Sequence, residues 1–278
     1  MAAESELGGD LKTNPRVSTL AYFGTELRIK REQAGLSQVA FAQRMFCDRS
    51  HVSRIESAER VPTEDFAERC DEVLGTGGSF TRLWPIVIEH AYPDWFRPFV
   101  EMEKDAREIW DFENQVVPGL LQTEEYARAL FAAARVPNAD ELVAARMTRQ
   151  HILERDDRPR LWVVMDENVM QRVVAEPALM ARQLRAIIEA AEDDPRTIVQ
   201  VIPYDAGAHA SMDGPFAGLT MKEGAEVVCT EGRVRGLVIA ASDDVAEYSY
   251  LYDLLRADAL SPRASLDKIA ARAKELSS

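Results

Sequence analysis

The chain has 278 residues, with 33 Lys and Arg against 47 Asp and Glu, and a formal net charge of −14. Hydrophobic residues make up 46% and charged residues 29%, which excludes disordered and fibrous proteins, and the length favours two domains over one. The three cysteines, Cys47, Cys70 and Cys229, include no Cys-x-x-Cys pair. We therefore expect reduced thiols and no metal or other cofactor.

Residues 1–18 hold almost no large apolar side chains and are expected to form a mobile tail. No apolar run in the chain approaches the roughly 20 residues that a helix needs to cross a bilayer. We therefore expect a cytoplasmic protein without a membrane partner.

Residues 22–62 have the pattern of short helices joined by tight turns. Gly35 suits the left-handed position after a first helix, and Ser37 can cap a second one. Asp48 can cap a third helix, whose inward side chains would be Val52 and Ile55. This arrangement is a helix-turn-helix, and it predicts an all-α N-terminal domain over residues 19–75.

The segment resembles the lambda-repressor-like DNA-binding domain of the XRE class. The matching positions are Leu36-Ser37-Gln38, Phe41-Ala42, Val52-Ser53-Arg54-Ile55-Glu56, Arg60 and Pro62. The chain departs from the pattern at Phe46 and Ser57, where the family often has Gly or Asn. The tight turns must therefore be built without glycine at these positions.

The resemblance implies that the third helix enters the major groove of double-stranded DNA. It assigns base-edge contacts to Arg49, Ser50 and Arg54, with His51 nearby, and a contact with the DNA backbone to Gln38. Hydroxyls near helix N-termini commonly contact phosphates, so we expect Ser37 and Ser53 to add phosphate contacts. An Arg side chain can form two hydrogen bonds with guanine O6 and N7, although a solvated surface position is the alternative for Arg49. Arg31 and Glu56 match an ion pair inside the family's domain, so we expect a structural role for them.

The charge is distributed in a way that agrees with a DNA-binding segment. Residues 16–62 hold eight basic and five acidic side chains, a charge of +3. The remainder holds 25 basic and 42 acidic side chains, a charge of −17. An acidic body would repel DNA as a whole, but one small basic region can still bind it.

Residues 76–95 are expected to form a linker, because Gly75–Ser79 is the clearest loop in the chain and Pro93 follows a short helical stretch. Beyond it, patterns typical of helices and strands alternate. Helices are predicted at 124–134, 177–191 and 244–257 and after Ser265 as an N-cap, and strands at 161–165, 198–202, 216–221, 227–230 and 237–240. We therefore expect an α+β domain with a small mixed or antiparallel sheet over residues 96–278.

Residues from about 96 onward resemble the C-terminal domain of actinobacterial regulators of the WhiJ type. The most specific match is the run Val117-Pro118-Gly119-Leu120-Leu121-Gln122-Thr123. The resemblance implies a domain that senses or binds something, with a small protein encoded by a neighbouring gene as a recurrent partner in an antitoxin-like pair.

The residues taken as a candidate partner or ligand surface are Pro118, Gly119, Gln122, Thr123, Glu167 and Glu231. In the alternative interpretation, Pro118-Gly119 is a turn that enters a helix capped by Thr123. The two glutamates would then be ordinary solvated side chains.

The sequence offers no catalytic motif of the Gly-x-Ser-x-Gly, Walker, Rossmann or His-Glu-x-x-His type. His209-Ala210-Ser211-Met212-Asp213 brings three catalytic residue types together, but a catalytic triad is defined in space. We therefore expect a protein that is not an enzyme.

The predicted function is a sequence-specific DNA-binding transcriptional regulator. It would bind a double-stranded operator as a homodimer and associate with the nucleoid when bound. The C-terminal domain would supply dimerisation and the sensing of a ligand or partner protein. One alternative is a protein–protein adaptor or antitoxin-like partner whose DNA binding is secondary, and another is an enzyme fused to a DNA-binding module.

Overall fold

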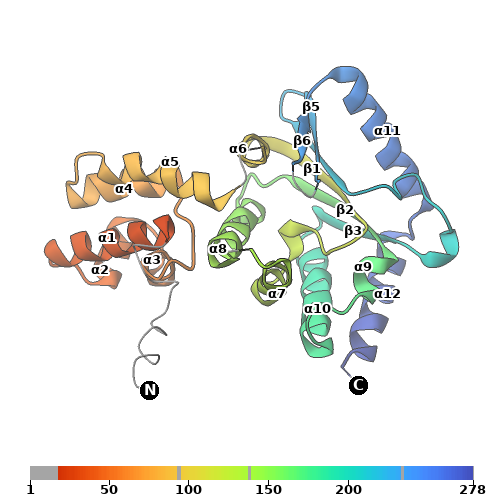
Figure 1. The fold of residues 1–278 in the computed structure, drawn as a ribbon, viewed down its shortest axis with the longest axis horizontal. Helices are drawn as coiled ribbons and strands as arrows, with labels where there is room; N and C mark the ends of the chain where they lie inside the picture. Colours follow the sequence, from red (N-terminus) through yellow and green to blue (C-terminus); the bar gives the residue numbers. More distant parts are fainter. Residues whose placement is uncertain (1–17, 93–94, 137–138, 233–234, 278) are drawn as a thin grey trace, which may run out of the picture. The chain divides into compact units, whose positions relative to one another are not determined.

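The computed structural model describes residues 18–92, 95–136, 139–232 and 235–277. The chain divides into two compact units (Figure 1). The described residues of Met1–Pro93 and Ala134–Thr148 form a helical unit, and those of Asp94–Ala133 and Arg149–Ser278 form an α+β unit. Both parts of the predicted fold class are therefore confirmed. Within the described ranges, no helix is long and apolar enough to cross a membrane.

The helical unit begins with five helices, and the first three of them form the predicted helix-turn-helix. Side-chain oxygens of Ser18, Ser37 and Thr63 accept backbone amides and so cap the first, second and fourth of them. Residues 1–17 of the predicted tail lie outside the described residues. The helices are α1 (Thr19–Gln33), α2 (Gln38–Arg44), α3 (Arg49–Glu56), α4 (Glu64–Leu74) and α5 (Ser79–Ala91).

The turn between α2 and α3 is built without glycine. Phe46 adopts a φ of +53°, in the left-handed region that disfavours side chains, and its ring is 83% exposed. The turn before α2 uses Gly35, at a φ of +68°, as the sequence predicts. Asp48 occupies the N-cap position of α3, but its side chain forms no capping hydrogen bond.

The stretch predicted as a linker contains α5, which belongs to the core of the helical unit. Phe80 and Val87 are each 1% exposed and belong to the core of the unit, where α5 packs against α1 and α4. The Asp71 carboxylate accepts the amides of Phe80 and Thr81 and so fixes the start of α5. The helical unit therefore extends well past residue 75, because α5 supplies apolar side chains that the core needs.

A sixth helix, α8 (Ala139–Arg149), completes this unit although it comes much later in the chain. Ala144 and Ala145 are each 1% exposed and belong to the same core as Phe41 and Ile55. The Thr148 hydroxyl accepts the amide of Val61, and Tyr92 donates its hydroxyl to the carbonyl of Ala145. The predicted boundaries put this segment in the C-terminal domain, whereas its contacts place it in the helical unit.

A mixed six-stranded sheet forms the centre of the α+β unit. The strand order is β3-β2-β1-β4-β5-β6, with β1, β2 and β3 parallel and the other neighbours antiparallel. The strands are β1 (Ala106–Glu113), β2 (Arg160–Asp166), β3 (Thr197–Ile202), β4 (Phe216–Met221), β5 (Glu226–Thr230) and β6 (Leu237–Ile239).

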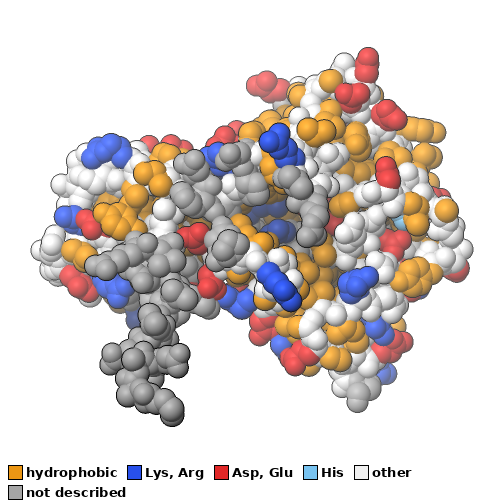
Figure 2. Space-filling view, in the orientation of Figure 1, with side chains coloured by type: hydrophobic (Ala, Val, Ile, Leu, Met, Phe, Trp, Pro, Cys, Tyr) orange, Lys and Arg blue, Asp and Glu red, His pale blue; other side chains and the backbone are white. Residues whose placement is uncertain are grey.

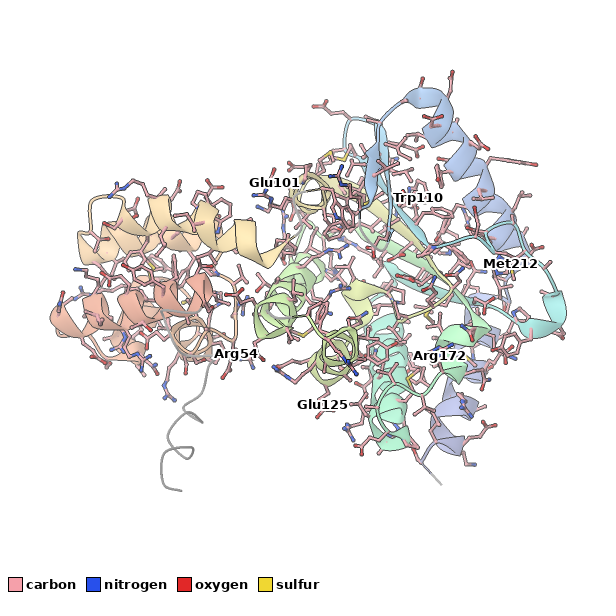
Figure 3. The ribbon with its side chains drawn as sticks, viewed as in Figure 1. Arg54, Glu101, Trp110, Glu125, Arg172 and Met212 are labelled. Atoms are coloured by element: carbon pink, nitrogen blue, oxygen red, sulfur yellow. The ribbon has the colours of Figure 1, made fainter. Side chains whose placement is uncertain are left out.

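Helices cover both faces of this sheet. Helix α11 (Ser242–Asp258) packs on an aromatic core that includes Trp110, which Figure 3 shows in the layer between strands and helix. Helices α10 (Pro177–Asp193) and α12 (Pro262–Glu275) pack on each other and on β3 at the other face. The remaining elements are α6 (Arg97–Glu103), η2 (Gly119–Leu121), α7 (Glu124–Ala134), η3 (Gln150–Glu154), α9 (Glu167–Gln171) and η4 (Tyr204–Ala206).

All five predicted strands form, with bounds that differ by one residue at most, but the central strand β1 was not predicted. Its sequence, AREIWDFE, carries four charged residues, yet five of its eight residues are buried, Asp111 among them. Pairing on both edges, rather than apolar alternation, places this segment in the sheet.

The predicted N-cap of the last helix was wrong by one turn. Ser261 caps α12, and its side chain accepts the amide of Ala264. Ser265 is fully buried and accepts the amide of Val201 from β3. The helix therefore starts earlier, with Pro262 at its first position, a place where proline is well tolerated.

A charge introduced into α8 should destabilise the helical unit selectively. Ala144→Asp places a carboxylate in its apolar core, and we expect a loss of about 3 kcal/mol or more. Hydrogen exchange should show weaker protection in α1–α5 while the amides of β1–β6 keep theirs. The control Ala133→Asp adds the same charge at an exposed position of α7 and should leave the protection of both α1–α5 and β1–β6 unchanged. Equal loss of protection in both units would contradict the assignment of α8.

Candidate nucleic-acid interface

The solvent-facing side of α3 holds four of the side chains predicted to meet DNA. Arg49, Ser50 and Arg54 are exposed and Ser53 is half-buried, while Val52 and Ile55 are fully buried on the opposite side. Successive residues of a helix are rotated by about 100°, so positions 49, 50, 53 and 54 share one half of the surface. Figure 3 labels Arg54 on this helix. The structure therefore brings these four side chains together.

The guanidinium groups of this surface have no partner among the described residues. The hydroxyl of Ser57 donates to the backbone carbonyl of Arg54, but no described residue forms an ion pair or a hydrogen bond with the guanidinium group of Arg49 or Arg54. Each guanidinium presents its N–H donors in a flat fork that matches a guanine edge or a phosphate. The surface can thus bind a partner rich in hydrogen-bond acceptors and negative charge.

His51 differs from its neighbours on α3. Its ring is half-buried and lies 5.1 Å from the ring of Phe66 in α4, measured between centroids. Two residues after Arg49 the helix has turned by about 200°, so this side chain points toward the domain interior. The structure therefore separates His51 from the exposed surface of α3.

A buried ion pair fixes α3 against α1. Arg31 donates from Nε to Glu56 Oε1 at 2.5 Å and from Nη2 to Oε2 at 3.0 Å, and both residues are about 5% exposed. Arg31 also donates to the carbonyl of Leu36 at 2.7 Å, in the turn before α2. The hydrogen bond that Arg31 donates to Glu56 raises the pKa of Arg31 against the opposing effect of burial. The structural role predicted for this pair agrees with these contacts.

The same carboxylate holds Gln38, the residue predicted to meet the DNA backbone. Gln38 Nε2 donates to Glu56 Oε2 at 2.8 Å. A carboxamide nitrogen has two hydrogens, so one remains for an outside acceptor. The buried pair therefore sets the direction of the Gln38 side chain at the start of α2.

The backbone of α1 approaches α3 closely at Gly24. A Cβ at this position would collide with the carbonyl oxygens of Ile55 and Glu56 at the end of α3. Only glycine permits this distance between the two helices. No local sequence pattern marks Gly24, because the need for glycine there arises from the contact between α1 and α3.

The run from Val117 to Thr123 forms a buried turn in the α+β unit. Gln183 donates to the carbonyl of Leu121 and accepts the amide of Thr123. Gln150 donates to the carbonyls of Gly119 and Gln122. Pro118, Gly119 and Gln122 are buried and Thr123 is half-buried, so these contacts favour the structural interpretation of the run over a partner surface.

The two candidate glutamates lie in different surroundings. Glu167 is 7% exposed and accepts hydrogen bonds from Lys268 Nζ and the amide of Tyr204, both at 2.9 Å. Burial works to raise the pKa of Glu167, but the hydrogen bonds from Lys268 and Tyr204 outweigh it and lower the pKa. Glu231 is exposed and lines a cavity beside α11.

The His209 segment does not bring its serine hydroxyl to the imidazole. His209 Nε2 lies 3.1 Å from Asp166 Oδ2, and its Nδ1 accepts the amide of Ser211. The hydroxyl of Ser211 instead donates to the carbonyl of Gly214 at 2.8 Å. These contacts hold the loop before β4 in place.

Comparisons with known proteins match both parts of the chain. Residues 96–271 match the model of a domain of unknown function, DUF5753. Residues 23–84 match the model of a helix-turn-helix domain, which reaches into α5. Neither the curated proteins nor the solved structures give a significant match to the chain.

Without one partner of the buried pair, the helical unit should unfold at a lower concentration of denaturant. Glu56→Ala leaves the Arg31 guanidinium buried without its carboxylate, and we expect a loss of about 3–5 kcal/mol in the free energy of unfolding. Chemical denaturation with a probe in the helical unit measures it. The control Glu59→Ala removes an exposed carboxylate three residues later and should cost under about 0.5 kcal/mol. If Glu56→Ala lost no more free energy of unfolding than Glu59→Ala, this would contradict a structural role for the pair.

Glu167 should contribute a pH-dependent part of the stability. Because its pKa is lowered in the folded state, its contribution is complete above the unfolded value of about 4.3 and is lost as the pH falls through the folded pKa. Unfolding of wild type and Glu167→Gln between about pH 7 and pH 3 should give a difference that shrinks toward acid. The exposed control Glu223→Gln should give a small, constant difference. A difference for Glu167→Gln that does not change with pH would contradict the assignment.

Proposed function

The chain belongs to the DUF5753 family, and we propose that it is a sequence-specific DNA-binding transcriptional regulator of the XRE type. The observation that carries the proposal is the exposed surface of α3 on a helix-turn-helix, with two Arg side chains whose guanidinium groups no described residue binds. The α+β unit is assigned dimerisation and the sensing of a ligand or partner protein. No catalytic activity is part of the proposal.

Base-edge recognition is assigned to Arg49, Ser50 and Arg54. Each bidentate contact between Arg and guanine contributes about 1–3 kcal/mol of discrimination against a wrong base. The hydroxyl of Ser53 and the second N–H of the Gln38 carboxamide are assigned hydrogen bonds to phosphates of the DNA backbone. His51 is left out of the contact set, because its ring packs on Phe66.

The buried pair explains how so small a surface can be specific. Contacts with bases require side chains held to within a fraction of an ångström, and α3 is held by Glu56 from inside. The acidic remainder of the chain, with a charge of −17, opposes non-specific attraction to DNA. Binding therefore depends on the fit of α3 to its site.

Two copies of the protein are assigned to one operator, which they bind as a homodimer. Regulators with a helix-turn-helix bind half-sites about 34–36 Å apart, so that two recognition helices enter successive major grooves on one side of the duplex. An operator selected by this protein should therefore be an inverted repeat with about 10 base pairs between the half-site centres.

Selection from a random DNA library with the full-length protein tests the proposal. The selected duplex and a scrambled duplex are then titrated at one fixed salt concentration with wild type and with Arg49→Ala. We expect the variant to lose about 1–3 kcal/mol of discrimination between the two duplexes. The control Arg28→Ala removes an equal charge from the exposed side of α1 and should leave the discrimination unchanged.

Two outcomes would count against the regulator. If the protein selects no sequence and binds no duplex at low salt, the adaptor or antitoxin-like alternative replaces it. If Arg49→Ala and Arg28→Ala weaken both duplexes equally, the Arg side chains act through charge alone and α3 reads no sequence.

A further inference from the structure

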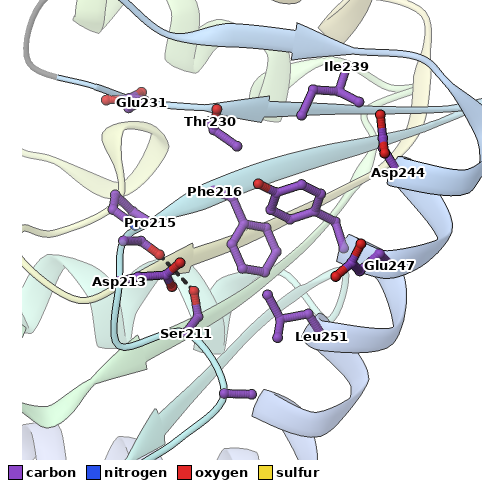
Figure 4. Close-up of a pocket in the computed structure, with 13 residues that line it drawn as sticks. Ser211, Asp213, Pro215, Phe216, Thr230, Glu231, Ile239, Asp244, Glu247 and Leu251 are labelled. Carbon is purple, nitrogen blue, oxygen red and sulfur yellow. Dashed lines mark hydrogen bonds between the residues drawn. The ribbon is translucent and has the colours of Figure 1, made fainter.

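A cavity of about 580 Å³ lies in the α+β unit, outside the helix-turn-helix. Three segments form its walls: the loop of residues 210–215 before β4, the adjoining ends of β4, β5 and β6, and the first half of α11. Figure 4 shows the loop on one side and α11 on the other, with Phe216 between them. The volume is in the range of sites for small molecules, about 300–1,000 Å³.

Aromatic side chains form the base of the cavity. Phe216 is 3% exposed, and its ring lies edge-to-face with that of Tyr248 at 5.1 Å between centroids. On its inner side Phe216 packs against Phe112 and Trp110 at 5.8 and 6.1 Å. These rings belong to the core between sheet and helix, so the cavity is formed before any ligand enters.

Four carboxylates surround this aromatic base. Asp213 comes from the loop before β4, Glu231 follows β5, and Asp244 and Glu247 come from α11 (Figure 4). The described residues that line the cavity include no Lys or Arg. The helix dipole by itself favours an acid at Asp244, in the first turn of α11, but it does not account for the other three.

The four carboxylates of the cavity are exposed, whereas two other acids of the same unit, Glu103 and Glu167, are buried. Glu103 is paired with Arg149, and Glu167 with Lys268. Over the described part of the chain, no basic side chain forms an ion pair with any of the four carboxylates. Burial, and after it the charges of Asp213, Glu247 and Asp244, raise the pKa of Tyr248, which lines the same cavity.

A single metal ion does not fit this arrangement. Among the described residues, no group of three or more His, Cys, Asp or Glu side chains could hold one ion. Asp213 and Glu231 stand on one side of the aromatic base, and the two acids of α11, Asp244 and Glu247, stand on the other (Figure 4). A complementary ligand carries at least two positive groups on an apolar chain long enough to join the two sides.

We infer that this cavity binds a small organic polycation, with ammonium groups on a short aliphatic chain. One ammonium group meets Asp213 and Glu231, and another meets Asp244 and Glu247. The aliphatic chain lies over Phe216 and Tyr248, where methylene burial and cation–π attraction add to the ion pairs. The binding step is independent of DNA, and only its use as a regulatory signal rests on the proposed function.

Calorimetric titration of the full-length protein with spermidine, in the absence of DNA, tests the inference. At about 0.15 M salt, exposed charges farther apart than the Debye length are largely screened, so general attraction to an acidic surface contributes little. We expect saturable binding of one spermidine per chain and no binding of 1,8-octanediol, which has a similar length and no charge. Binding of neither compound overturns the inference and leaves the DNA-binding proposal intact.

A pair of matched double variants separates the cavity from the overall charge. Asp213→Asn with Glu247→Gln removes one carboxylate from each side of the cavity and should weaken spermidine binding by about tenfold or more. Asp243→Asn with Glu223→Gln removes the same charge from exposed positions that do not line the cavity and should leave the affinity within about twofold. Equal weakening by both pairs would show attraction to the acidic surface and overturn the inference.

A steric variant keeps all four carboxylates and fills the space. Thr230→Trp, at the end of β5, should abolish spermidine binding while hydrogen exchange of the sheet stays unchanged. Undiminished binding by this variant would place the ligand outside the cavity. Tighter competing binding of Mg²⁺, or of a tri-lysine peptide, would also overturn the inference, because a metal ion or a basic segment of a partner protein would then be the occupant.

Discussion

The buried ion pair between Arg31 and Glu56 is the interaction on which the candidate DNA-binding surface depends. It joins α1 to α3, reaches the turn before α2 through the carbonyl of Leu36, and orients Gln38 at the start of α2. A buried charge is costly without its partner, so the pair tolerates only one arrangement of these helices. The absent side chain at Gly24 lets α1 and α3 approach to the distance at which the pair forms. The exposed side chains of α3 are therefore positioned from the interior of the domain.

Partners also hold several buried polar groups in the core of the α+β unit. Gln183 and Gln150 satisfy the carbonyls of the turn at 118–122, and Arg149 and Lys268 neutralise the acids nearest to them. Buried polar groups with partners stabilise a single conformation. The cavity beside α11 differs, because exposed carboxylates that form no ion pair with any described residue surround its aromatic base.

Chain order and compact units do not coincide in this protein. Helix α8 lies within the segment that matches the DUF5753 model, yet it packs in the core of the helical unit through Ala144, Ala145 and Thr148. The next residues, Arg149 and Gln150, bind Glu103 and the turn at 119–122 in the α+β unit. One continuous segment thus contributes residues first to the helical unit and then to the α+β unit.

The sequence by itself determined the helix-turn-helix, the α+β class of the second unit and five of the six strands, because these follow from capping residues, turn residues and local apolar periodicity. It also identified the Arg31–Glu56 pair through a family resemblance. Only the tertiary structure placed β1 at the centre of the sheet, α8 among the N-terminal helices, and His51 toward Phe66. The carboxylates of the cavity come from three separate segments, so no local pattern could join them. Local patterns report what one segment does with its nearest neighbours, whereas burial and convergence are set by contacts between segments far apart in the chain.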